Sequence, residues 1–170
     1  DNCYAWIFTN LTHTLYLFGQ DRSEQTLQQI LERSFGGVVI TDFYSTYENY
    51  FKHQQKCWAH VLRDAIKLML LHTEKKEYQQ FFEKMHTIFR AAKDIASQDL
   101  TGVQRNRKIA GLQRRVSNAC PRYLERLTKD TPDDMRKFVN LQKRLIRYQD
   151  NLFVFVSQPD VAPTNNRAEQ

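Results

Sequence analysis

Two acidic residues of this sequence, Asp42 and Glu169, are candidates for acting together in one reaction. Asp42 follows Thr41 at the end of Val38-Val-Ile40, a short apolar run that predicts a buried β-strand. Open α/β sheets bind ligands at the carboxyl ends of their strands, so an acid there can face a crevice while the strand holds it rigid. Asp42 is therefore a candidate metal ligand, and capping of the turn after the strand is the alternative.

Glu169 is the second carboxylate, 127 positions after Asp42. Asn166-Arg-Ala-Glu169 has the spacing of a helix capping box, in which the glutamate bonds back to the cap residue. A divalent cation needs several oxygen ligands. Glu169 is thus a metal ligand only if the fold brings it beside Asp42, and a capping residue otherwise.

The motif Cys57-Trp-Ala-His60 has half the spacing of a zinc site. A structural zinc takes four ligands, and the other cysteines, Cys3 and Cys120, offer no second pair. We expect instead a packed cysteine and a hydrogen-bonded histidine at the start of a helix.

Several common classes of enzyme lack their motifs in this chain. The sequence contains no nucleophile elbow, no glycine loop that cradles phosphate and no dinucleotide-binding fingerprint. Its three cysteines are widely spaced, and it has neither a signal peptide nor an apolar run of about 18 residues. We therefore expect a reduced, cytoplasmic protein that is not a membrane protein.

Positive charge is concentrated in one part of the chain. The formal net charge is +6, but residues 101–147 hold thirteen Lys or Arg against four acids, which leaves the remainder at −3. Such a stretch is typical of proteins that bind a polyanion, because each neutralised phosphate releases counterions. A solvated helix face is the alternative. The predicted DNA contacts are Arg114, Arg115, Arg144 and Arg147.

The hydrophobic pattern changes along the chain from strand-like to helical. Residues 3–9 and 13–18 predict two neighbouring strands, and residues 23–37 predict a helix capped by Ser23 and ended by Gly36-Gly37. Residues 38–41 predict a third strand. Residues 58–150 repeat apolar side chains at three and four positions, which predicts almost continuous helix. Residues 152–156 fit either a helix end or a strand.

We expect a single α/β domain over residues 1–170, in which residues from about 72 to 150 form a helical insertion before a last helix. The chain begins without Met and stops just after a predicted helix start, so we expect both ends to be truncated.

Three motifs together resemble the central domain of bacterial transposases of the insertion sequence 66 family. They are Gly37-Val-Val-Ile-Thr-Asp-Phe-Tyr-Ser-Thr-Tyr47, Cys57-Trp-Ala-His-Val-Leu-Arg-Asp64 and Pro163-Thr-Asn-Asn-Arg-Ala-Glu169. Residues 4–9, Tyr16 and Arg22 also sit where that family has two strands and a following arginine. The resemblance spans the chain, strongly at the three motifs and loosely in the helical part.

The resemblance implies an RNase H-like mixed sheet and a DDE site in which three acids gather two metal ions, Mg²⁺ or Mn²⁺. Asp42 matches the second acid and Glu169 the third. The first acid should lie on a strand before Cys3, because Asp1 matches poorly, so the chain alone should be inactive. Cys57, His60 and Asn166 would lie near the site. Segments 3–9, 13–18 and 38–41 should then form one mixed sheet, and an all-helical structure or unconnected sheets would end the RNase H-like interpretation.

The function that the resemblance implies is metal-dependent cleavage and strand transfer of DNA, which move an insertion sequence. The partners would be the element ends and target DNA, bound by a homo-oligomer. A non-catalytic RNase H-like module for DNA binding or assembly is the alternative.

Overall fold

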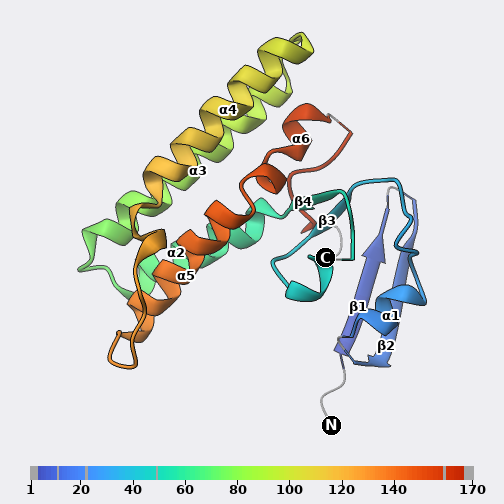
Figure 1. Cartoon of the computed structure of the whole chain (residues 1–170), viewed down its shortest axis with the longest axis horizontal. Helices are drawn as coiled ribbons and strands as arrows, with labels where there is room; N and C mark the ends of the chain where they lie inside the picture. Colours follow the sequence, from blue (N-terminus) through green and yellow to red (C-terminus); the bar gives the residue numbers. More distant parts are fainter. Residues whose placement is uncertain (1–3, 11, 22, 49, 159, 167–170) are drawn as a thin grey trace.

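The computed structural model describes residues 4–10, 12–21, 23–48, 50–158 and 160–166. Cys3, Arg22 and Glu169 lie outside these ranges. Two small sheets lie on one side and a block of long helices extends to the other (Figure 1). The described elements are, in chain order, β1 (Tyr4–Thr9), β2 (Thr14–Gln20), α1 (Glu24–Gln28), β3 (Val39–Thr41), η1 (Ser45–Tyr47), β4 (Gln54–Lys56), α2 (Trp58–Leu71), α3 (Lys76–Ala96), α4 (Gly102–Ala119), η2 (Pro121–Leu124), α5 (Asp133–Arg147), η3 (Asp150–Leu152) and α6 (Val154–Ser157).

The strands β1 and β2 pair antiparallel as a hairpin. Its turn is closed by Asn10, whose Oδ1 accepts hydrogen bonds from the backbone N–H groups of Thr12 and His13 at 2.9 and 2.8 Å. The predicted pair of neighbouring strands is therefore confirmed for the described residues.

The helix α1 begins as predicted but ends early. Ser23 caps it by accepting a hydrogen bond from the N–H of Thr26 at 3.4 Å. The carbonyl of Leu27 then accepts from both Ile30 and Leu31, so the chain turns away after Gln28 and does not continue to the glycines. Gly37 does not end the helix. Glycine fits at this position because a Cβ there would lie 2.5 Å from the ring of Phe35.

The predicted single sheet is wrong for the described residues. The strand β3 pairs in parallel with β4, with Thr41 opposite Lys56, while β1 and β2 form a separate two-stranded sheet. The sequence gives no signal for β4, because its residues Gln54, Gln55 and Lys56 are polar. All three are buried nevertheless, since each finds hydrogen-bond partners inside the protein.

The side chain of Gln55 explains how a polar strand is accommodated. Its Nε2 donates to the carbonyl of Leu152 at 3.1 Å, and its Oε1 accepts from the N–H of Phe155 at 2.9 Å. The indole N–H of Trp58 donates to the same carbonyl of Leu152 at 2.7 Å. These bonds fasten β4 and the start of α2 to the chain around η3 and α6.

The helical prediction for residues 58–150 is confirmed by α2, α3, α4 and α5. Buried side chains follow α3 at intervals of three and four residues, from Tyr78 to Ala92, and meet the apolar faces of the other helices. Burying each large side chain contributes about 1.5–3 kcal/mol, so this core supplies most of the stability of the block. Residues 152–156 form η3 and α6 and no strand. No described helix combines the length and apolar character needed to cross a bilayer.

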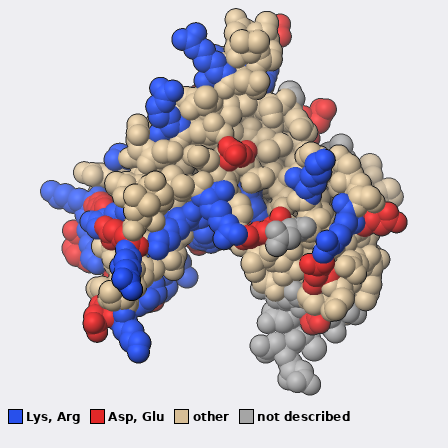
Figure 2. All heavy atoms as spheres, in the orientation of Figure 1, with Lys and Arg blue, Asp and Glu red and all other residues tan. Residues whose placement is uncertain are grey.

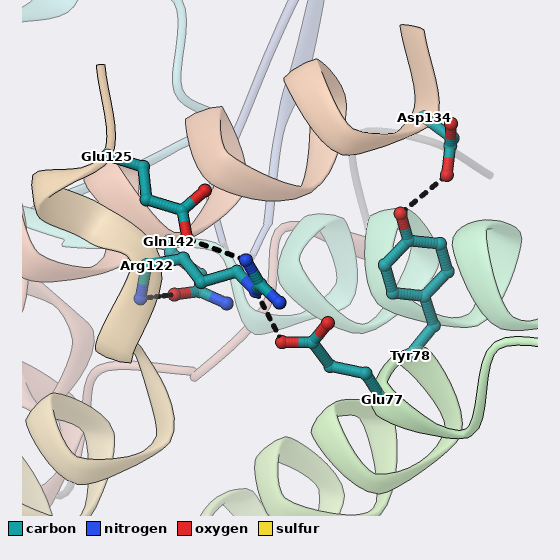
Figure 3. Close-up of polar contacts among 6 residues, drawn as sticks. All are labelled: Glu77, Tyr78, Arg122, Glu125, Asp134 and Gln142. Carbon is teal, nitrogen blue, oxygen red and sulfur yellow. Dashed lines mark hydrogen bonds and ion pairs between the residues drawn. The ribbon is translucent and has the colours of Figure 1, made fainter. Parts of the chain in front are cut away.

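A polar network joins α3, η2 and α5 at one end of the block (Figure 3). Pro121 follows the end of α4, and the backbone N–H of Arg122 then donates to Oε1 of the buried Gln142 at 2.8 Å. The guanidinium of Arg122 pairs with Glu77 and with Glu125, both at 2.6 Å. The turn after α4 is thereby held against its two neighbouring helices.

Asp134, in the first turn of α5, forms a second polar contact with α3. The hydroxyl of Tyr78 donates to its carboxylate at 2.6 Å (Figure 3). Lys75 forms an ion pair with the same carboxylate. The hydrogen bonds from Lys75 and Tyr78 lower the pKa of Asp134 from 3.8 to about 2.

We expect Asp134→Asn to reduce the free energy of unfolding at pH 7 by about 1.5–3 kcal/mol, as measured by urea denaturation, because hydrogen bonds to a charged group are lost. The pKa of Asp134 is lowered on folding, so its contribution is present above about pH 4 and is lost as the pH falls toward 2. The stabilities of wild type and variant should therefore converge between pH 4 and pH 2. A difference that persists at pH 2 would contradict this origin. Asp130→Asn, at an exposed position, is the control.

Candidate functional site

Asp42 lies at the carboxyl end of β3, as predicted, and is partly exposed. Its Oδ1 accepts a hydrogen bond from the N–H of Tyr44 at 2.8 Å, so the side chain does cap the following turn. Among the described residues, no hydrogen bond to Oδ2 is formed. The turn therefore fixes the carboxylate through one of its two oxygens.

The ammonium group of Lys56 is buried next to this carboxylate. Its Nζ donates to the hydroxyl of Thr41, to the backbone carbonyl of Asp42 and to Oε1 of Gln54, each at 3.0 Å, and lies 5.0 Å from the ring centre of Tyr148. Burial lowers the pKa of Lys56 to about 8, against the attraction of Asp42. The sequence gave no reason to single out Lys56, because β4 itself was not predicted. Its hydrogen bond to the carbonyl of Asp42 helps to fix the backbone at that residue.

The Cys57-Trp-Ala-His60 motif stands at the beginning of α2, where Cys57 is the buried N-cap residue. Burial raises the pKa of the Cys57 thiol, but hydrogen bonds from the side chain of His60 and from the backbone N–H of Asn165 outweigh it, so the pKa is lowered. The predicted packed cysteine and hydrogen-bonded histidine are confirmed. Among the residues that the structure describes, no group of three or more His, Cys, Asp or Glu side chains is placed to hold a metal.

Backbone hydrogen bonds bring the three motifs together around the start of α2. The N–H of Cys57 donates to the carbonyl of Thr41 at 2.9 Å, and the N–H of Trp58 donates to the carbonyl of Pro163 at 3.0 Å. The N–H of Asn165 donates to the sulfur of Cys57 at 3.4 Å. The segment that leads to the last helix therefore runs beside the end of the β3–β4 pair, where Asp42 lies.

The last described residue, Asn166, is exposed and already helical. The predicted capping box between Asn166 and Glu169 includes a residue outside the described ranges and stays a prediction. Glu169 lies outside the described residues, so its separation from Asp42 stays a prediction.

The four arginines predicted to bind DNA have two different environments. Arg144 pairs with Asp64 at 2.5 Å, and Arg147 pairs with Glu48 at 2.6 Å. Arg114 and Arg115 are exposed on α4 and take part in none of the ion pairs among the described residues. In Figure 2, blue and red spheres lie close together around α5, whereas Lys and Arg side chains project from the edge along which α4 runs.

Comparison with known proteins identifies the family. No curated protein and no solved structure matches the chain. The family described as "Transposase IS66 family" matches residues 1–170, the whole chain, including the three motifs that meet at the start of α2. The protein therefore belongs to the IS66 family of transposases.

Proposed function

We propose that the chain is the catalytic core of a DDE transposase, in which Asp42 and Glu169 hold the divalent metal ions used to cleave and rejoin DNA strands. The observation that carries this proposal is the pair of hydrogen bonds that joins the three motifs, from the N–H of Cys57 to the carbonyl of Thr41 and from the N–H of Trp58 to the carbonyl of Pro163. Two carboxylates on separate elements can share a metal only if those elements meet. The bonds at Cys57 and Trp58 support such a meeting.

The donor chemistry of Asp42 fits a metal ion of this kind. Mg²⁺ and Mn²⁺ prefer carboxylate oxygens, and the Asx turn at Asp42 engages only Oδ1 among the described residues. Lys56 donates to the backbone carbonyl of Asp42 rather than to its carboxylate in the described hydrogen bonds. When bound, a metal pair would activate the attacking oxygen and stabilise the leaving oxygen at phosphorus. Asp42 contributes a rigid ligand, because β3, the turn and Lys56 fix its backbone.

The unconnected sheets of the described residues count against an RNase H-like fold for this chain taken alone. We propose that fold only for a core in which a further strand joins the two sheets. Among the described strands, β1 pairs only with β2 and β3 pairs only with β4, so β1 and β3 each keep one edge available. In the view of Figure 1, β1 is on the side of the hairpin that faces β3. We place the strand that carries the first acid between these two edges, where it would join the sheets into one.

The proposed partners are the ends of the insertion sequence and the target DNA, bound by a homo-oligomer. The test is a cleavage assay with a transposase that contains this chain and the segment carrying the first acid, on duplex DNA with the terminal sequence of the element. We expect strand cleavage at the element end with Mg²⁺ or Mn²⁺ and none with EDTA. DNA binding without cleavage would contradict the proposal and support a non-catalytic binding or assembly module.

A further inference from the structure

The helix α4 differs from its neighbours in charge. It carries five basic residues and no acid, whereas α3 and α5 carry both signs. The high helix propensities of Arg and Lys favour such a helix, but Glu has a similar propensity, so propensity does not explain why acids are absent. The helix is anchored by a capping box at Thr101, in which Thr101 and Gln104 exchange hydrogen bonds at 3.0 and 3.3 Å.

One of the five basic residues has a structural role. Arg105 lies on the side of α4 that packs against the protein, and its guanidinium donates to the carbonyls of Val156 at 2.9 Å and Gln98 at 2.8 Å. Leu112 and Val116 are buried on the same side. Arg105 therefore ties the helix to the block.

The other four basic residues share the outer face. An α-helix turns by about 100° per residue, so these four positions span an arc of about 120° around the helix axis. The buried side chains lie outside this arc. All four are exposed, and none forms an ion pair with the described acids. They are Arg107, Lys108, Arg114 and Arg115.

The spacing along this face matches a nucleic-acid backbone. Arg107 and Lys108 precede Arg114 and Arg115 by seven residues, which is about 10.5 Å at the helical rise of about 1.5 Å per residue. Three base-pair steps of duplex DNA advance about 10 Å, at about 3.4 Å per phosphate on each strand. The two pairs of basic residues can therefore reach phosphates about three base pairs apart.

Gly111 lies at the centre of the same arc. Glycine inside a helix costs about 1 kcal/mol relative to alanine, so it usually has a packing reason. Packing offers none here, because a Cβ built on Gly111 would meet no atom within 4 Å. The absence of a side chain at the centre of a basic face allows a phosphate backbone to approach the helix closely.

From these observations we infer that the outer face of α4, with its four basic residues around Gly111, binds the phosphate backbone of duplex DNA. The inference deepens the proposed function and rests on DNA being the partner. It assigns the contact to α4, where the charges are uncompensated, rather than to Arg144 and Arg147, whose charges are balanced by Asp64 and Glu48.

The charge test uses fluorescence anisotropy with a random-sequence duplex at several salt concentrations. Replacing the four outer residues by Gln should weaken binding by about 100-fold or more at 0.1 M salt and reduce the salt slope by about 3.6, at 0.9 per phosphate contact. The matched control removes four other exposed charges, Lys67, Lys76, Arg126 and Lys129, and should leave the slope nearly unchanged. An equal loss in both variants would overturn the assignment to α4.

The same assay separates this inference from the proposed function. If the wild-type chain binds DNA and the α4 variant binds equally well, the α4 surface is wrong while DNA binding stands. If the wild-type chain does not bind duplex DNA at all, the proposed function loses its partner and the inference fails with it. Binding of heparin without binding of DNA would likewise contradict both the proposed function and the inference.

Gly111 provides a second test that does not alter charge. Gly111→Leu should raise the melting temperature, because it improves helix propensity, and should weaken DNA binding by about 10-fold, because the side chain blocks the approach. Ala110→Leu, at a neighbouring exposed position outside the arc, should leave DNA affinity unchanged. Wild-type affinity in Gly111→Leu, or equal weakening in Ala110→Leu, would overturn the role of Gly111.

Discussion

Replacing Asp42 by Asn should reduce metal-dependent DNA cleavage by more than about 100-fold, since even the outer-shell partners of metal ligands contribute 10–100-fold. Asn keeps an oxygen that can accept the hydrogen bond from the N–H of Tyr44, so the turn after β3 should be preserved. It removes the negative charge that a divalent cation requires. The measurement is the rate of strand cleavage at the element end by the transposase with saturating Mg²⁺.

Two controls separate a lost ligand from a damaged protein. Asp42→Asn should bind element-end DNA at least as tightly as the wild type, because it removes a charge that repels phosphate and leaves the basic residues of α4 unchanged. Asp130→Asn, which removes an exposed acid from the turn before α5, should cleave at the wild-type rate. Cleavage by Asp42→Asn at the wild-type rate would show that Asp42 only caps a turn.

Replacing Trp58 by Ala should lower the free energy of unfolding by about 3–5 kcal/mol, as for other fully buried Trp residues. The indole is wholly buried, stacks on Phe89 at 5.1 Å and also meets Phe153 at 5.7 Å between ring centres. Its N–H donates to the carbonyl of Leu152. Because domains are stable by only about 5–15 kcal/mol, this loss is a large share of the total.

The conservative variant separates packing from hydrogen bonding at this position. Trp58→Phe keeps an aromatic ring but removes the indole N–H, so we expect a loss of about 1–3 kcal/mol. Leu124→Ala, at an exposed position, should change stability by less than about 0.5 kcal/mol. Chemical denaturation followed by circular dichroism gives all three values. Equal stability of wild type and Trp58→Ala would contradict the role of Trp58 in the core.

The parts of the fold that follow local patterns could be predicted from the sequence. The hairpin and the long helices have apolar side chains at the spacing of their own elements, and Ser23 supplies a recognisable cap. Local sequence also predicted two features of the site. The apolar run before it placed Asp42 at a strand end, and the lack of a second pair of zinc ligands indicated that Cys57 is packed.

The features that depend on tertiary contacts could not be predicted. The strand β4 is polar, and two of the hydrogen bonds that satisfy the side chain of Gln55 come from Leu152 and Phe155, about 100 residues later. Without β4, neither the β3–β4 pair nor the buried Lys56 could be foreseen. The sequence likewise could not reveal that Arg144 and Arg147 are balanced by Asp64 and Glu48, which come from other elements.

Paramagnetic broadening by Mn²⁺ tests most directly whether Asp42 and Glu169 share a metal site. In a titration of the chain followed by NMR, we expect the amide signals near residues 40–44 and 165–170 to broaden first, while those of α4 stay sharp. Asp42→Asn should abolish the broadening at both places together, and Asp130→Asn should not. Broadening that survives Asp42→Asn, or that affects only one of the two acids, would contradict a shared site.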